Sequence, residues 1–300
     1  MWNYRSTNQV GKKKFIMKKF KIILKRFLLN KGSAFGGIFL ILIVFGAIFA
    51  PIIAPYDWNA VDTGPRLSAP SWEFLFGTDI HGRDVFSRII YGARYSLSVG
   101  VISVLFGIIS GSIFGITIAY IGGRVDVIGS RIIDVMFGFP SFLLSLLVVA
   151  IIGVGLWNVV FAVGLASIPH FARIIRSAAL QVKEQPYIEA CVSLGYGNIR
   201  IMFNHILPNI FPIIIVIATL DLGGAIISIA SLSFLGLGAQ PPEPEWGAML
   251  SSGREYMRYA PWTMIYPGLF LFLTVMSVNL LGDRLSIALD ARQSIGKGKV

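Results

Sequence analysis

Hydrophobic residues in this chain gather into long runs, and polar stretches rich in Gly, Pro and charged residues separate the runs. Each run is close to or above the roughly twenty apolar residues that a helix needs to cross the hydrocarbon core of a bilayer. The predicted spans are residues 34–53, 96–121, 132–154, 157–175, 210–236 and 262–285. The pattern therefore predicts an all-α polytopic membrane protein with six transmembrane helices.

The spans divide the chain into five parts. Residues 1–33 are predicted to be a basic amphipathic segment on the cytoplasmic membrane surface, because Lys and Arg are interleaved there with Phe, Ile and Leu. The other parts are a first transmembrane helix (34–56), an extracytoplasmic region (57–92), a transmembrane core (93–293) and a cytoplasmic tail (294–300). A cleaved signal peptide is the alternative for the N-terminus, but the first apolar run is too long and lacks a clear A-x-A site.

Composition agrees with a membrane protein, since 55% of the residues are hydrophobic, 14% are charged and the mean hydropathy is +0.74. The net charge of +11 suggests nucleic acid at first, but ten of the 26 Lys and Arg precede residue 32 and most others flank apolar runs. With both termini inside, twenty of the 26 lie in cytoplasmic segments, in accord with the positive-inside rule. We therefore expect cytoplasmic termini, a lipid bilayer as surroundings and no nucleic-acid partner.

The longest polar interruption of the core, residues 180–209, is predicted to be a cytoplasmic helix-turn-helix. Pro186 suits the first turn of a helix, and Gly195 can adopt the left-handed conformation that ends one. Asn198 is expected to cap a second short helix, and Pro208 marks the start of the next element. Because helices this short are marginal alone, we expect a partner to supply part of their packing.

This loop resembles the E-A-A…G…L-P loop of bacterial ABC importer permeases, which docks on the ATPase subunit. Glu189-Ala190-Cys191, Gly195 and Leu207-Pro208 match it in spacing, and Cys191 replaces a second alanine with another small apolar residue. The residues that the resemblance implies for ATPase docking are Tyr187, Glu189, Ala190, Cys191, Leu194, Gly195, Leu207 and Pro208. Glu189 would be a polar contact to the ATPase, and Gly195 would allow close approach.

Three further motifs narrow the resemblance to the dipeptide, oligopeptide and nickel branch of these permeases. They are G-T-D-I-H-G-R-D-V-F-S-R at 77–88, S-F-L-G-L-G-A-Q-P-P-E-P-E-W-G-A-M-L at 233–250, and the ending around N-L-L-G-D-R at 279–284. Charged residues in the first motif can pair with one another at a wet interface. Residues expected to face a binding protein are Asp79, Arg83, Asp84, Arg88, Glu245 and Trp246.

The resemblance implies the type I ABC importer permease fold in the bacterial cytoplasmic membrane. The implied partners are a homologous second permease, two ATPase subunits and an extracytoplasmic solute-binding protein, with ATP and Mg²⁺ bound by the ATPases and no cofactor bound by this chain. The chain would form half of the pathway for dipeptides or oligopeptides. Nickel or a metal chelate is the alternative substrate, and the import direction itself follows only from the resemblance.

Two features inside the spans carry their own predictions. Gly107, Gly111 and Gly115 recur every fourth residue and predict a smooth face on which another helix packs closely. Asp221 lies near the middle of the fifth span, where an acid is costly. It is a candidate for a residue that lines or gates the pathway, and the alternative is an acid that bonds to a neighbouring helix.

The sequence shows no signature of covalent catalysis or of a metal site. No P-loop G-x-x-x-x-G-K-[ST], H-E-x-x-H, C-x-x-C or G-x-S-x-G occurs. We therefore expect a transport subunit and no enzyme. The rival classes are an ion-driven secondary transporter powered by Asp134, Asp221 or His170, for which no clear internal repeat is seen, and a scaffold protein, for which the ordered loop has no evident use.

Overall fold

The computed structural model describes residues 31–297, and these residues form an all-helical fold with a single isolated bridge between Thr78 and Asp84. The predicted all-α class is therefore confirmed. The predicted basic segment lies almost wholly outside the described residues. The elements are α2 (Lys31–Ile48), α3 (Ala50–Ile53), α4 (Val85–Ile121), α5 (Gly123–Phe137), α6 (Ser141–Ile152), α7 (Leu156–Lys183), α8 (Pro186–Ser193), α9 (Asn198–Ile201), the π-helix η1 (Met202–Ile206), α10 (Leu207–Phe234), α11 (Trp246–Gly253), the 3-10 helix η2 (Arg254–Tyr256) and α12 (Trp262–Lys297).

Four helices of the described part are long and apolar enough to cross a membrane, namely α4, α7, the continuous helix Asn198–Phe234, and Trp262–Ile287 within α12. The helices α5 and α6 pass the same test only as a pair, and they are bent by 88° at Gly138-Phe139-Pro140. The third predicted span, residues 132–154, is therefore two helices, because the residue before a proline is disfavoured in the helical conformation. The first predicted span, residues 34–53, corresponds to α2, a shorter apolar helix that α3 follows.

Several helices extend beyond the predicted spans. The second span begins at Val85 and not at residue 96, because the Asp84 side chain caps the helix by accepting the N–H of Ser87. At the other ends, α7 continues to Lys183 and α12 continues to Lys297, into what was predicted to be a tail. Polar residues thus extend the helices past their apolar segments, which hydropathy alone does not reveal.

The core of the fold is the interface between α4 and α7. A Cβ added to Gly111 would lie 2.7 Å from the Cβ of Phe171, and one added to Gly115 would lie 2.6 Å from the carbonyl of Ala172. Only glycine permits this approach of the two backbones. The predicted packing face is therefore confirmed, and it places α7 firmly against α4 along much of its length.

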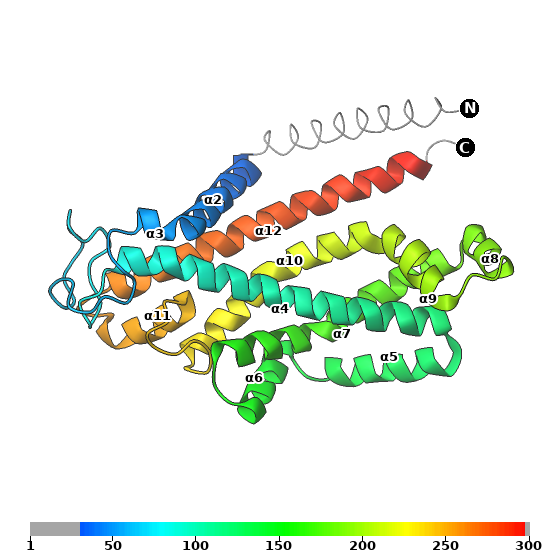
Figure 1. The fold of residues 1–300 in the computed structure, drawn as a ribbon, viewed down its shortest axis with the longest axis horizontal. Coiled ribbons are helices and arrows are strands. Elements are labelled where there is room, and N and C mark those ends of the chain that lie inside the picture. Colours follow the sequence, from blue (N-terminus) through cyan, green and yellow to red (C-terminus); the bar gives the residue numbers. More distant parts are fainter. Residues whose placement is uncertain (1–30, 298–300) are drawn as a thin grey trace.

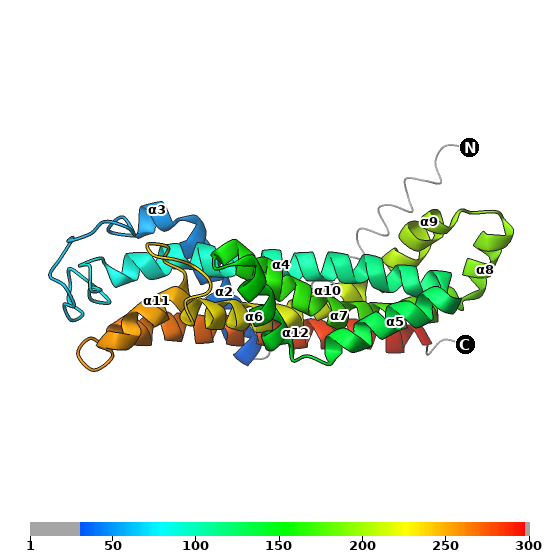
Figure 2. The ribbon, with the colours of Figure 1, turned by 90° about the horizontal axis from the view of Figure 1, so that it is seen from below.

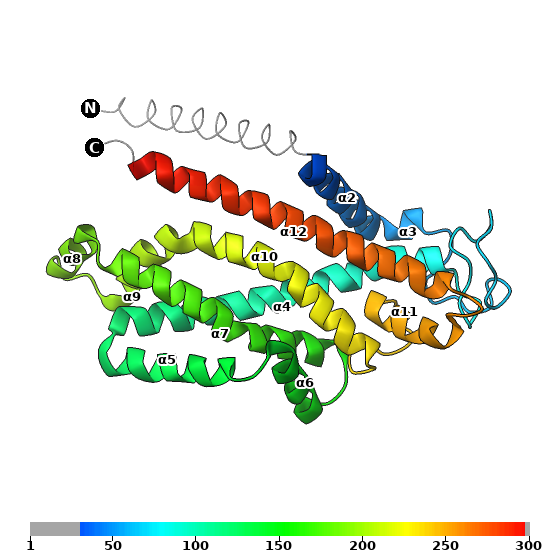
Figure 3. The ribbon, with the colours of Figure 1, turned by 180° about the vertical axis from the view of Figure 1, so that it is seen from behind.

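The long helices run along the longest axis of the molecule, and the connections gather at its two ends (Figure 1). The α8 and α9 helices lie at one end, near the C-terminal end of α12; the segment between α3 and α4 lies at the other end, together with α11. The view from behind gives the same separation, and the edge view shows an elongated bundle (Figures 2 and 3). The α8–α9 connection and the connections around α11 therefore lie at opposite ends, whereas the connection between α5 and α6 lies partway along the molecule.

Candidate functional sites: an exposed helical loop and a charged cavity

The α8–α9 loop, residues 184–206, is a well-formed helix-turn-helix. Pro186 occupies the first turn of α8, and Gly195 adopts φ +77° directly after it, as predicted. The N–H of Gly195 bonds to the carbonyl of Val192 at 2.9 Å, and the N–H of Tyr196 bonds to that of Cys191 at 3.1 Å. This pair of bonds is a Schellman motif, which ends a helix with its last carbonyls satisfied. The loop is thus ordered by its own backbone.

The loop exposes apolar side chains at the end of the molecule. Leu194 is 72% exposed and Ile199 is 70% exposed, and Tyr187, Val192 and Phe203 are also exposed. Glu189, Ala190 and Gly195 lie among them with exposed surfaces. A gathering of exposed apolar groups with a polar residue beside it is typical of a surface that binds another protein.

Cys191 and the L-P pair differ from the other predicted docking residues. Cys191 is buried, with its Sγ 3.9 Å from Nε2 of His205, so in this structure it packs α8 against η1 and does not lie on the exposed surface. Leu207 is partly buried and Pro208 is exposed at the start of α10. The small size of residue 191 therefore allows α8 and η1 to pack together inside the loop.

A π-turn joins the loop to α10 without a break. The N–H of Leu207 bonds to the carbonyl of Met202, five residues earlier. Pro208 explains this wider turn, since its ring has no N–H to donate and would clash with the carbonyl four residues before it. The second half of the loop and the fifth span therefore form one helix, Asn198–Phe234.

Lys183 ties the loop to the end of α4. Its Nζ donates to the carbonyls of Ala119 and Tyr120 at 3.1 and 2.7 Å. The hydroxyl of Tyr120 in turn donates to Oδ1 of Asn198 at 3.2 Å. Asn198 does not cap α9 as predicted, because Gly197 holds the capping position and the side chain of Asn198 is turned toward Tyr120. Both ends of the loop are thus fixed to α4.

Two Arg–Asp pairs hold α5 against α7 just before the loop. Arg176 bonds to Asp126 through Nε and Nη2, each at 2.6 Å from a carboxylate oxygen. Arg173 bonds to Asp134 at 2.6 Å and lies over the ring of Phe137. Sequence reasoning named Asp134 as a candidate for ion coupling and did not pair any of these charges. Opposite charges at the same end of consecutive spans were the signal that could have paired them.

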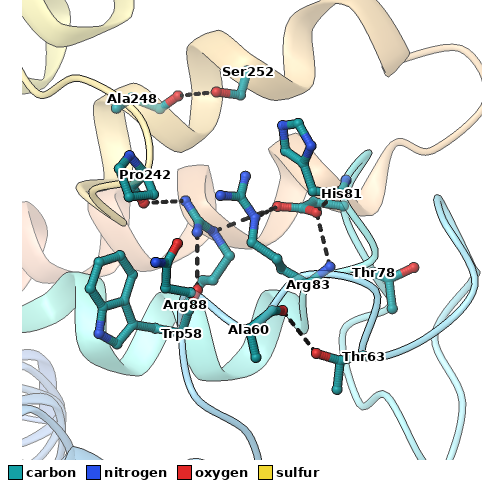
Figure 4. Close-up of polar contacts among 12 residues, drawn as sticks. Trp58, Ala60, Thr63, Thr78, His81, Arg83, Arg88, Pro242, Ala248 and Ser252 are labelled. Atoms are coloured by element: carbon teal, nitrogen blue, oxygen red, sulfur yellow. Dashed lines mark hydrogen bonds and ion pairs between the residues drawn. The ribbon is translucent and has the colours of Figure 1, made fainter.

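At the opposite end of the molecule, Asp79 organises a charged cluster. Its Oδ2 lies 2.7 Å from Nε of Arg83 and 3.7 Å from Nε of Arg88, and its Oδ1 accepts the N–H groups of His81 and Arg83. Arg88 also donates to the carbonyls of Trp58 and Pro242 (Figure 4). The predicted pairing of these charges is confirmed for Asp79, Arg83 and Arg88.

Four of the residues predicted to face a binding protein lie in the interior instead. Asp84, Arg88, Glu245 and Trp246 are at most 5% exposed, so this structure does not present them on its surface, and a contact with a binding protein stays a prediction. Oε2 of Glu245 accepts the N–H of Ala248 at 2.9 Å and so caps α11, and Nε1 of Trp246 donates to the carbonyl of Ile89 at 3.1 Å. These side chains fix α11 to α4. Burial raises the pKa of Glu245, and the two backbone N–H groups that bond to it oppose this rise.

Asp221 lies partly buried on α10 and faces Ser167 and His170 of α7. Its Oδ2 is buried, and within the described residues it has no hydrogen-bond partner. A carboxylate that bonds fully to a neighbouring helix, which was the alternative from the sequence, is not what the structure has. In the described part of the chain, no group of three or more His, Cys, Asp or Glu could hold a metal ion.

Comparison with known proteins accounts for nearly the whole chain. Residues 103–295 match the family described as binding-protein-dependent transport system inner membrane component, and residues 19–70 match the N-terminal TM domain of oligopeptide transport permease C. The dipeptide transport system permease protein DppC of Alkalihalophilus pseudofirmus is 44% identical over 88% of this chain and 86% of its own length. The glutathione transport system permease protein GsiD of Pectobacterium atrosepticum is 44% identical over 96% of each chain.

A solved structure shares the fold of this chain. A chain of the inward-facing MetNI methionine ABC transporter superposes with a TM-score of 0.54, at 18% sequence identity, over 68% of this chain and 97% of its own. The likeness extends to the permease architecture and no further. Such permeases are transport subunits, and not enzymes, that work with an ATPase and a substrate-binding protein. This chain therefore belongs to the binding-protein-dependent inner-membrane permease family of bacterial ABC importers, as a multi-pass component of the inner membrane.

Proposed function

We propose that this chain forms one half of the translocation pathway of an ATP-driven importer of dipeptides and oligopeptides. Its partners would be a homologous second permease, two ATPase subunits and an extracytoplasmic solute-binding protein. ATP and Mg²⁺ would be bound by the ATPases, and no cofactor by this chain. The relatives support the substrate class, because they are named for dipeptides, di/tripeptides and glutathione, all of which are short peptides.

The α8–α9 loop is the observation that carries this proposal. It is ordered by its own backbone, exposes apolar side chains and is continuous with α10. We assign it to the cytoplasm, where Tyr187, Glu189, Ala190, Leu194 and Gly195 would contact an ATPase. Leu207 and Pro208 would link that contact to the fifth span. Twenty of the 26 Lys and Arg lie in this loop and the other segments predicted to be cytoplasmic, which supports this orientation with both termini cytoplasmic.

In the proposed mechanism, nucleotide-driven closure of the ATPases moves the loop, and the helices rock in response. The complex then has two conformations, and their equilibrium is shifted by nucleotide on one side of the membrane and by the loaded binding protein on the other. A cavity between the permeases would open alternately to the two sides of the membrane. Asp221, with its buried Oδ2 unpaired within the described residues, is our candidate for a pathway or gating residue.

The experiment that tests the proposal is purification of the tagged chain from its own membrane in mild detergent, followed by mass spectrometry of everything that accompanies it. We expect two ATPase chains and a second permease. The ligand of the accompanying binding protein should be a short peptide, whereas nickel or a metal chelate would replace the substrate assignment. A chain that emerges alone in several detergents, without ATP hydrolysis, would contradict the proposal.

Uptake measured with ATP held constant separates this function from ion-coupled transport. We expect a protonophore to leave peptide uptake unchanged, because ATP supplies the energy. Loss of uptake under that condition would favour coupling through Asp221, since its carboxyl group lies within an apolar helix and its buried Oδ2 has no hydrogen-bond partner in the described fold.

A further inference from the structure

A small charged cavity lies at the α11 end of the molecule, beside the Asp79 cluster. Its volume is about 150 Å³, and its walls include Asp79, Arg83, Arg88, Gln240, Glu243 and Ser251. One water occupies roughly 10–15 Å³ on this scale, so the cavity has room for on the order of ten. That room suits a ligand with about as many heavy atoms as a small dipeptide.

Arg83 is the one arginine of this cluster whose terminal nitrogens make no hydrogen bond within the described residues. Its Nε is bonded to Asp79, whereas Arg88 uses both Nη atoms on the carbonyls of Trp58 and Pro242. Arg83 is only 7% exposed, yet it lines the cavity. Figure 4 shows its guanidinium beside Arg88 and His81, on the side that faces Ala248 and Ser252 of α11.

The geometry leaves donors for a ligand. A guanidinium presents two parallel N–H groups that suit a carboxylate. The two oxygens of Asp79 are already occupied by Arg83, Arg88 and backbone N–H groups. Arg83 and Arg88 together also carry one positive charge more than Asp79 neutralises. The cavity is therefore prepared for an anionic group at Arg83.

Glu243 adds the opposite charge to the same cavity. It lines the wall, and within the described residues its carboxylate forms neither an ion pair nor a side-chain hydrogen bond. A cavity that offers the terminal nitrogens of Arg83 and the carboxylate of Glu243 matches a ligand with both charges. A short peptide has a terminal carboxylate and a terminal ammonium, whereas an acidic side chain of a docked protein has only the first.

We propose that this cavity is a subsite for short zwitterionic peptides on their way into the pathway, with Arg83 binding the terminal carboxylate and Glu243 facing the ammonium. The inference rests on the proposed function, because it assumes that short peptides are the substrate. It makes Arg83 a specificity-determining residue of the permease itself, separate from whatever selection the binding protein makes.

The test measures binding of alanyl-alanine and of its C-terminal amide to the assembled transporter purified without its binding protein. In the unaltered transporter we expect the free acid to bind at least about tenfold more tightly than the amide. Arg83→Gln should remove this preference by weakening the acid about tenfold and leaving the amide unchanged. Arg66→Gln is the matched control, since Arg66 lies in the same segment but pairs with Asp62 at an exposed site.

Arg83→Gln also removes a bond to Asp79 and could therefore change the structure around the cavity. A second variant separates loss of binding from such a change. Glu243→Gln removes the charge of a carboxylate that has no bonded partner in the described fold, so it should leave the fold intact. We expect it to weaken alanyl-alanine but not N-acetylated alanyl-alanine. Equal binding of acid and amide by the unaltered transporter, or equal losses for both in Arg83→Gln, would overturn the proposal.

Arg83 could instead bind an acidic side chain of the binding protein, and the test distinguishes this carboxylate from that of a peptide. In that case Arg83→Gln would raise the concentration of loaded binding protein needed for half-maximal ATP hydrolysis and leave dipeptide binding as it was, which also overturns the subsite. Failure of the proposed function looks different. There, the unaltered transporter would show no ATP hydrolysis stimulated by peptide-loaded binding protein, whatever residue 83 is.

Discussion

Arg176 of α7 and Asp126 of α5 form a two-point ion pair, with both N–O distances at 2.6 Å. The pair spans fifty residues of sequence and joins the first half of the bent span to the helix that leads into the α8–α9 loop. Side chains about 20–29% exposed place it at a partly shielded position. If the loop moves as proposed, this ion pair connects that movement to α5.

We predict that Arg176→Ala weakens this connection and lowers the apparent Tm in detergent by a few degrees, for a loss of about 1–2 kcal/mol. The double charge reversal Arg176→Asp with Asp126→Arg should restore part of it. Restoration is incomplete because Asp126 lies in the first turn of α5, where a positive charge opposes the helix dipole. Arg173→Ala is the comparison, and its effect should be smaller because that pair is 52% exposed at both residues.

The attachment of Lys183 to α4 gives a second prediction. Lys183→Met keeps the aliphatic stem but removes two bonds to carbonyls, at a cost of about 1–3 kcal/mol. The loop should then open more often, and the single cysteine of the chain, Cys191, reports this because it is buried there. We expect faster labelling of Cys191 by a maleimide. Lys183→Arg retains donors and should label like the unaltered protein; equal rates for all three would remove the proposed anchoring role.

Gly195 tests the docking role of the loop. A Cβ at this position meets nothing within 4 Å, although φ is +77°. Asp and Asn both tolerate this conformation better than other residues. Gly195→Asp is expected to leave the chain in the membrane while reducing copurified ATPase to about one tenth or less. Gly195→Asn, of the same shape without charge, should retain more ATPase; normal uptake by Gly195→Asp would contradict the assignment.

The burial of Glu245 leads us to predict that the stability of the folded protein depends on pH. Burial raises its pKa in the folded protein above the ordinary value of 4.5. The folded state then holds the proton more tightly than the unfolded state, so this contribution to stability is full below pH 4.5 and is lost as pH rises through the raised pKa. Glu245→Gln keeps an acceptor for the cap and has no such loss. The Tm advantage of the Gln variant should therefore grow with pH above about 4.5, and a pH-independent difference would refute it.

The sequence predicted the helical class, the glycine face of α4 and the left-handed turn at Gly195, because each follows from local residue types. It missed the break at Pro140, where an apolar run conceals a bend of 88°. It also assigned Glu245 and Trp246 to a partner because they lie in a motif that leads to the predicted outside of the membrane. Their burial depends on contacts with Ser96 and Ile89 far away in the chain. Long-range pairs of this kind have no local signature.

The continuous helix Asn198–Phe234 has a mechanical consequence. Its 37 residues, at about 1.5 Å each, make a rod about 55 Å long. A tilt of about 5° at the loop would carry the far end by about 5 Å, enough to repack side chains there. The π-turn at Met202–Ile206 is where such a rod is least stiff. If the loop docks on an ATPase as proposed, the movement delivered to the far side of the membrane is therefore set by the five residues of η1 at the end of the loop.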